Sequence, residues 1–143
     1  MFYYKFIKNK IIVKNYIYIR IKLYKKSNGV FYMEISVKEL DNNTVILKLD
    51  GDIDVYTSSD LKDTIFLQID IGAKNIIIDM ENVYYIDSSG IGIFISALKY
   101  IKKEEGKICI IKITEPVKKV FELTKITNFF PIYLSETEAL NSF

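Results

Sequence analysis

The pattern of hydrophobic and polar residues changes its period along the chain, and each period predicts a different kind of element. Residues 33–39 alternate between apolar and polar, residues 41–43 read DNN, and apolar residues return in 44–50. This pattern predicts two strands joined as a hairpin. Residues 76–80, IIIDM, form a short apolar run typical of a central strand that is buried on both faces. Two further short apolar runs, at 107–113 and around 129–134, predict two more strands.

Apolar residues at helical spacing fall between these strands. A first helix is expected to begin at Thr57 or Ser58, with a buried stripe of Leu61, Ile65 and Ile69, and with Phe66 beside it. A second helix is expected over about 89–104, and its predicted buried face consists of Ile91, Phe94, Ile95, Leu98 and Ile101.

Two terminal signals predict the remaining helices. Pro116 suits the first turn of a third helix, and the pair Ser135 and Glu138 forms a capping-box pattern at the start of a last one. The predicted order is therefore β-β-α-β-α-β-α-β-α, which indicates a single α/β domain with a mixed β-sheet packed against helices.

Charge divides the chain into two parts. Residues 1–32 carry eight Lys or Arg and no acid, whereas residues 33–143 carry twelve Lys or Arg against eighteen acids. The first part also holds six of the eleven tyrosines. We therefore treat 1–32 as a basic extension and 33–143 as the domain.

The basic extension has several interpretations. It could be a membrane-surface segment or a nucleic-acid-binding arm, but basic residues interrupt every apolar stretch, so it is not a spanning helix. It is also a poor signal peptide. Phe, Tyr, Ile, Lys and Asn are encoded by AT-rich DNA, and Met33 opens a clean strand, so our hypothesis is that the true start is Met33. No membrane contact and no direct nucleic-acid binding are expected for 33–143.

The scarcity of histidine and cysteine excludes several kinds of chemistry. The chain has no histidine and one cysteine, Cys109, so a transition-metal site is not expected. Cys109 lies in the apolar run KICIIKI and is expected to be buried and inert. No disulfide can form within the chain, which fits a reducing cytoplasm.

The segment 86–92, IDSSGIG, is the strongest candidate for function, because a short strand passes there directly into a helix. A helix amino terminus offers unpaired N–H groups and a partial positive charge. Ser88 or Ser89 could simply cap this helix, or a serine hydroxyl could be modified there. A phosphate would add nearly two negative charges, and Gly90 and Gly92 would let a partner or phosphate approach the backbone.

Two catalytic or signalling classes fit this junction poorly. A serine hydrolase would need a base, and both histidine and the G-x-S-x-G motif are absent. A receiver domain would use an acidic magnesium pocket such as Asp52, Asp54 and Asp79. However, the acidic pair follows a second strand that belongs to a hairpin, and the expected lysine after the last strand is replaced by Ser135.

From Met33 to about Phe143 the sequence resembles the STAS-domain family, specifically the bacterial anti-sigma factor antagonists. The resemblance rests on LDGDIDVYTSSDLK, IIIDMENVYYIDSSGIGIF, GKICIIKITEPVKKVFELTKI and FPIYLSETEAL. It implies a STAS-like fold and a regulatory protein that is not an enzyme and needs no cofactor. The unphosphorylated form would bind an anti-sigma factor, itself a serine kinase, and so release a sigma factor.

The resemblance also implies roles for single residues. Ser88, directly after Asp87, is the expected phosphorylation site, and a separate serine phosphatase would restore the active form in this partner-switching cycle. Asp87 would orient the hydroxyl for the kinase or add repulsion afterwards, and Ser89 is expected to cap the helix. Gly90 is expected to lie at the partner contact.

Other assignments stay open at this stage. Asp52 and Asp54 match the family's acidic loop, and they either contact the partner or are solvated turn residues. Ile93, with Ala97 and Tyr100, either forms a docking patch or packs against another element. Asp79 is expected to make a local hydrogen bond at the end of its strand. The alternative function is a STAS interaction module of another regulatory or transporter-associated complex, without phosphorylation of Ser88.

Overall fold

The computed structural model describes residues 10–13, 16–19, 33–41 and 43–143. Within the basic extension, β1 (Lys10–Val13) and β2 (Tyr16–Ile19) pair with each other as a two-stranded antiparallel sheet. The rest of the extension lies outside the described residues. The expected start at Met33 therefore stays a prediction.

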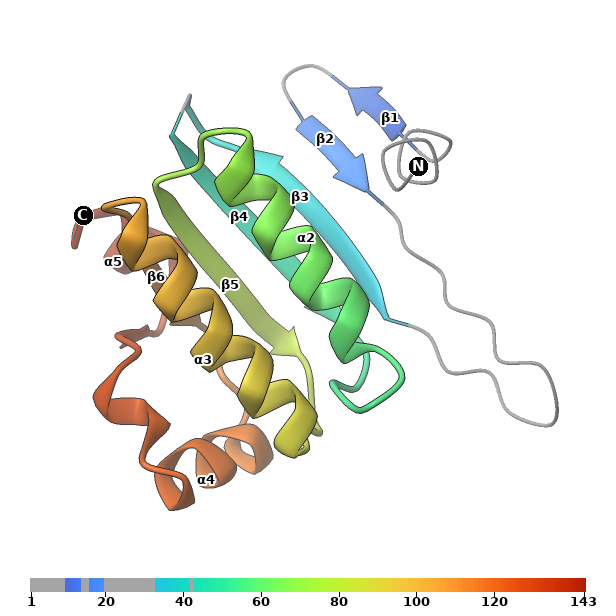
Figure 1. Ribbon diagram of the computed structural model, residues 1–143, viewed down its shortest axis with the longest axis vertical. Coiled ribbons are helices and arrows are strands. Elements are labelled where there is room, and N and C mark those ends of the chain that lie inside the picture. The colour runs from blue at the N-terminus through green and yellow to red at the C-terminus, as the bar shows by residue number, and fades with distance from the viewer. Residues whose placement is uncertain (1–9, 14–15, 20–32, 42) are drawn as a thin grey trace, which may run out of the picture.

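The domain is built on a five-stranded mixed sheet (Figure 1). The first two strands form the predicted antiparallel hairpin, and the remaining neighbours are parallel. The spatial order follows the chain order: β3 (Glu34–Glu39), β4 (Thr44–Asp50), β5 (Asn75–Asn82), β6 (Lys107–Ile111) and β7 (Ile132–Tyr133). The antiparallel first pair differs from the all-parallel sheet of a receiver domain.

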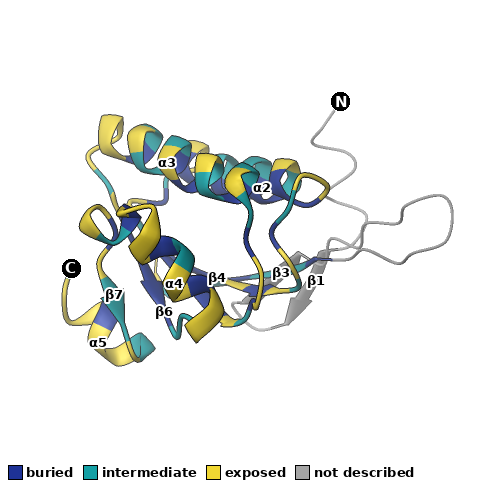
Figure 2. Cartoon of the chain, turned by 90° about the horizontal axis from the view of Figure 1, so that it is seen from below, coloured by how far each residue is buried: buried dark blue, intermediate teal, exposed yellow. Residues whose placement is uncertain are grey.

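Helices connect the parallel strands, as parallel pairing requires. They are α2 (Ser58–Asp70), α3 (Ser88–Lys103) and α4 (Glu115–Leu123), with a short 3-10 helix, η1 (Ile126–Asn128), after α4; a last helix, α5 (Glu136–Leu140), follows β7. Figure 2 shows α2 and α3 on one face of the sheet and α5 on the other. The predicted order β-β-α-β-α-β-α-β-α is confirmed for residues 34–140.

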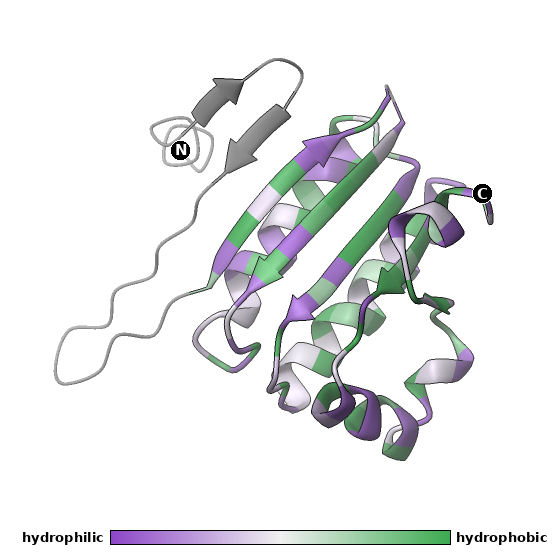
Figure 3. Ribbon diagram, turned by 180° about the vertical axis from the view of Figure 1, so that it is seen from behind, coloured by the Kyte–Doolittle hydropathy of each residue, from purple (hydrophilic) through white to green (hydrophobic). Residues whose placement is uncertain are grey.

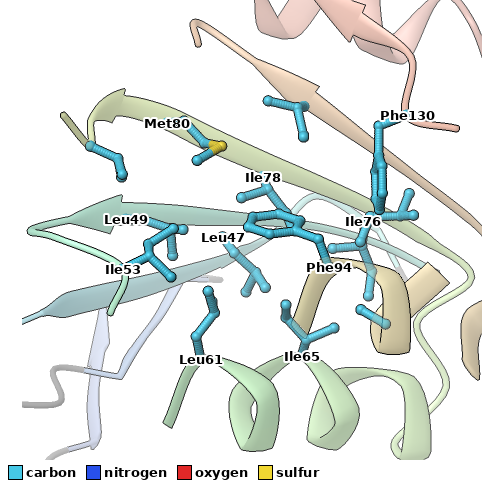
Figure 4. Close-up of a cluster of buried hydrophobic side chains, with 14 of the residues drawn as sticks. Leu47, Leu49, Ile53, Leu61, Ile65, Ile76, Ile78, Met80, Phe94 and Phe130 are labelled. Atoms are coloured by element: carbon cyan, nitrogen blue, oxygen red, sulfur yellow. The ribbon is translucent and has the colours of Figure 1, made fainter. Parts of the chain in front are cut away.

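The main core lies between the sheet and the pair α2 and α3 (Figure 4). Alternate residues of each strand point into it because side chains in a strand alternate between faces. Phe94 of α3 stands near its centre and meets Phe121 and Phe130 edge to face, with ring centroids 5.7 and 5.8 Å away. This geometry is favourable for aromatic pairs and holds α3 to the carboxyl-terminal third of the domain.

The opposite face of the sheet is covered less completely (Figure 3). A small second core around Ile46, Ile77 and Cys109 lies there with Ala139 of α5. Burial raises the pKa of the Cys109 thiol to about 12, so the thiol is inert, as predicted. Towards the carboxyl ends of the strands, this face becomes charged.

The buried face of α3 differs in part from the prediction. Phe94 and Ile101 are buried, and Ile91 and Leu98 are partly buried, but Ile95 is 41% exposed. The centre of the face is instead formed by Gly90, Phe94, Ala97 and Ile101. Small residues let the helix approach its neighbours closely, and a pattern based only on large apolar residues overlooks them.

Candidate functional site

Two loops that are far apart in sequence meet at the carboxyl ends of β4 and β5. The loop after β4 carries Ile53, and the loop after β5 carries Ile86; the two residues form an isolated parallel bridge. The N–H of Ile53 donates to the carbonyl of Tyr85 at 3.0 Å, and the N–H of Asp87 donates to the carbonyl of Ile53 at 3.0 Å. The acidic loop at 51–57 is thereby held beside the start of α3.

Asp87 is the residue that caps α3. One carboxylate oxygen of Asp87 accepts hydrogen bonds from the N–H groups of Ser89, at 2.8 Å, and Gly90, at 3.2 Å. The expected capping role of Ser89 is therefore wrong, because both serines already lie inside the first turn. A negative charge at this end of a helix is also favoured by the helix dipole.

Ser88 is left accessible by this arrangement. It is the first residue of α3 and is exposed, whereas Ser89 is half-buried. No described residue forms a hydrogen bond with the hydroxyl of either serine. The Ser88 hydroxyl therefore faces solvent from a fixed point on the backbone, where another protein can reach it.

Close packing around Gly90 leaves no room for a side chain. A Cβ atom at this position would lie 2.6 Å from Cγ2 of Ile53 and 2.6 Å from Cγ1 of Ile86, the two bridged residues. Gly90 is buried, so its influence on a partner would act through the position of α3. A Cβ at Gly92, in contrast, would meet no atom within 4 Å.

The acidic loop is shaped by Asp54. Its carboxylate accepts from the N–H groups of Tyr56, at 2.8 Å, and Thr57, at 3.1 Å. The hydroxyl of Thr57 accepts from the N–H of Asp54 at 3.0 Å and donates to the carbonyl of Asp52 at 2.7 Å. Thr57 occupies the cap position of α2, as predicted, but its side chain orders the loop rather than bonding to the helix.

Asp52 differs from Asp54 in its surroundings. Asp52 is exposed, and its carboxylate makes no interaction with a described residue. Asp54 has a structural role in the turn, so its contact with a partner is no longer needed to explain it. Partner contact by either acid stays a prediction.

The loop before α3 is also held by a hydrogen bond from the loop after β6. Thr114, just before α4, donates a hydrogen bond from its hydroxyl to the carbonyl of Val83 at 2.5 Å. The segment 83–87 is therefore tied to the loop after β4 and to the loop after β6. A serine placed at the end of such a segment has a well-defined position.

Two of the three residues considered as a docking patch on α3 make packing contacts within the domain, namely Ala97 and Tyr100. Ala97 is fully buried, and Ile93 is partly buried against the main core. The Tyr100 ring lies 4.6 Å from that of Phe66 on α2, and its hydroxyl donates to Asp70 at 2.5 Å. Tyr100 holds α3 against α2, and Ala97 packs in the main core, while contact of Ile93 with a partner stays a prediction.

Asp79 makes contacts within the sheet and its neighbouring loop. Its carboxylate accepts from the N–H of Glu81 at 3.0 Å, which is the expected local hydrogen bond, although β5 continues to Asn82. It also pairs with Lys112 at 3.5 Å. This neighbouring charge raises the pKa of Lys112. Among the described residues, no group of three or more His, Cys, Asp or Glu is arranged to hold a metal ion.

The sequence interpretation missed a set of exposed apolar residues around the site. Val55 is 63% exposed, Tyr56 50%, Tyr84 63% and Tyr85 53%. We call these four residues the apolar rim. They lie within three residues of Ile53 or Ile86 in sequence, on the two loops that this bridge joins beside the start of α3. The adjacent tyrosines in ENVYYID were the available signal, because large apolar residues in a loop need a reason to be there.

Comparisons with known proteins agree with this fold. Residues 34–139 match the family model of the STAS domain. The chain is similar to the anti-sigma-B factor antagonist of Staphylococcus aureus (strain NCTC 8325 / PS 47), with 28% identity over 86 residues, 60% of this chain and 80% of that protein.

Two solved structures are also similar. The anti-sigma factor antagonist SpoIIAA in its unphosphorylated form has 22% identity and a TM-score of 0.67, covering 76% of this chain and 94% of that one. The Bacillus cell fate determinant SpoIIAA in the phosphorylated form has 19% identity and a TM-score of 0.61, covering 76% and 97%. At these identities the likeness shows the fold. Within the described part of the chain, no helix has the length and apolar character needed to cross a membrane.

Proposed function

This chain belongs to the STAS domain family, and we propose that it is an anti-sigma factor antagonist whose binding is switched off by phosphorylation of Ser88. The unphosphorylated form binds an anti-sigma factor that is also a serine kinase, and a sigma factor is released. A serine phosphatase reverses the modification. Anti-sigma factor antagonists are non-enzymatic regulators, and the cycle is placed in the cytoplasm, where ATP and the sigma factor are found.

One observation carries the proposal: the exposed Ser88 hydroxyl, with no described partner, in the first turn of α3 directly after the capping Asp87. Structures of SpoIIAA exist in an unphosphorylated and in a phosphorylated form, which supports a modification in this fold.

The physical effect of the phosphate would be local. The segment before α3 is fixed by Ile53 and Thr114, so the fold has little reason to change. The new charge would stand beside Asp87 and the acidic loop, within the surface that meets the partner. A loss of a few kcal/mol there reduces affinity on the order of a hundredfold.

The test uses the purified chain, the anti-sigma factor of the same genome and Mg-ATP. We expect one phosphate on the wild type and on Ser89→Ala, and none on Ser88→Ala, as read by intact mass and fragmentation. In titration calorimetry, Ser88→Ala should bind the anti-sigma factor like the wild type, and Ser88→Asp should bind more weakly. Normal phosphorylation of Ser88→Ala, or no binding by the wild type, would contradict the proposal.

A further inference from the structure

The apolar rim is an exposed apolar feature of the two loops beside the start of α3, and its four residues lie outside the main core. We propose that it is the anchor for the anti-sigma factor, and that the matching surface of the partner is an apolar recess bordered by Arg or Lys. This inference rests on the proposed function and adds the contact residues and the chemistry of the partner surface. It assigns a function to Val55, Tyr56, Tyr84 and Tyr85.

The residue types fit an anchor. Three of the four are tyrosines, which offer a large apolar ring together with a polar tip, and tyrosine is enriched among the residues that dominate binding energy. Each is at least half exposed. All four lie on the two loops that the bridge between Ile53 and Ile86 joins, and exposed apolar residues on neighbouring segments are typical of protein contacts.

The backbone under the rim is fixed before any partner arrives. The carbonyl of Tyr85 accepts from Ile53, and the carbonyl of Val83, next to Tyr84, accepts from Thr114. On the other loop, the N–H of Tyr56 donates to the carboxylate of Asp54. A preformed contact surface loses less conformational entropy on binding, which favours affinity.

Charge around the rim identifies the kind of partner. Residues 50–60 and 82–98 together contain five acids and no Lys or Arg. These acids are Asp50, Asp52, Asp54, Asp60 and Asp87. A partner with Arg or Lys at the border of its recess would complement this surface, and its association would slow as salt is added.

The same charge argues against two other occupants. A second copy of this chain would bring acidic loop against acidic loop, and like charges facing each other oppose association. Nucleic acid would be repelled for the same reason, because its backbone is negative. A basic protein surface is the occupant that the charges favour.

The test measures the affinity of the anti-sigma factor of the same genome for rim variants. We expect Tyr84→Ala and Tyr85→Ala each to weaken binding by about tenfold or more. The matched controls are Leu123→Ala and Leu134→Ala, which truncate residues that are 83% and 82% exposed outside the rim, and these should bind like the wild type. Circular dichroism checks that each variant is folded.

Charge is tested by Asp52→Asn, because the Asp52 carboxylate contacts no described residue. The association rate should fall in this variant, and its dependence on salt should be weaker than that of the wild type.

Each outcome has one meaning. If the wild type binds and the tyrosine variants bind equally well, the rim is not the anchor, although the proposed function stands. If the tyrosine variants are weak and Asp52→Asn behaves like the wild type at every salt concentration, the basic border is wrong. If the wild type does not bind the anti-sigma factor, or if the rim instead mediates dimers in sedimentation velocity, the inference is overturned together with its choice of partner.

Discussion

Gly90 and Gly92 are two residues apart in α3 and have opposite surroundings. Gly90 faces the bridge between Ile53 and Ile86 so closely that no side chain fits without movement, whereas Gly92 faces open space. A sequence shows both only as glycines near a helix start. The structure separates a glycine required for packing from one that the fold does not need.

This contrast gives a paired prediction at the residue scale. Gly90→Ala should destabilise the domain by about 1–3 kcal/mol, because its Cβ would overpack the bridge. Gly92→Ala should stabilise it by about 0.5–1 kcal/mol, because alanine is the better helix former and the site is open. Urea unfolding followed by circular dichroism measures both, and equal changes in the two variants would contradict the packing account.

At the scale of elements, α3 is important because it carries the site at its first turn and the core at its centre. Its start is defined by Asp87, and its position by Phe94, Ala97 and the Tyr100 contact with α2. The helix is therefore a rigid support for Ser88. A change in the cap of α3 should therefore alter the position of Ser88.

The cap of α3 can be tested separately from the proposed phosphorylation. Asp87→Ala should lower the free energy of unfolding by about 1 kcal/mol, since two N–H groups lose their acceptor. Asp87→Asn should retain most of that stability, because asparagine caps almost as well. Ser89→Ala is the control and should change stability by less than about 0.5 kcal/mol. A larger loss in Ser89→Ala than in Asp87→Ala, measured by thermal unfolding, would restore serine as the cap.

The elements could be predicted from sequence because their signals are local. The hairpin, the α2 stripe of Leu61, Ile65 and Ile69, and the cap at Ser135 all depend on nearby residues, and the structure confirms them. The errors have a common physical cause. Ile95 was assigned to the buried face and Ala97 was left between docking and packing, because burial depends on the elements packed against α3, which a helical period does not reveal.

The site was only partly predicted, because some of its contacts are local in sequence and others are not. The junction at 86–92 is visible in sequence, but the bridge to Ile53 and the hydrogen bond from Thr114 join segments about 30 residues apart. Asp87 was assigned to repulsion or orientation, and its capping role became visible only with the backbone geometry. The apolar rim depends on exposure, which one sequence does not provide.

At the scale of the whole molecule, the strands of the basic extension and those of the domain belong to two different sheets. The strands β1 and β2 form a sheet of their own, and the five-stranded sheet is formed entirely by residues after Met33. Met33 itself is buried in the main core. The charge division in the sequence therefore coincides with the boundary between the two sheets.

This boundary predicts that residues 33–143 fold without the extension. The shortened chain should unfold in one cooperative urea transition, with a free energy within about 1 kcal/mol of the full chain, because the main core is intact. It should also bind the anti-sigma factor with the affinity of the full chain. A shortened chain that is unfolded, or that binds much more weakly, would show that the extension belongs to the working domain.

The bridge between Ile53 and Ile86 also has a consequence for the newly made protein. Ser88 lies in its final setting only when the loop after β4 has docked and when Thr114, made later on the ribosome, has reached Val83. A nascent or misfolded chain contains the same local sequence but lacks this setting. If the proposed function holds, a kinase that recognises the assembled loops would not modify unfinished copies, and phosphorylation would be limited to folded molecules.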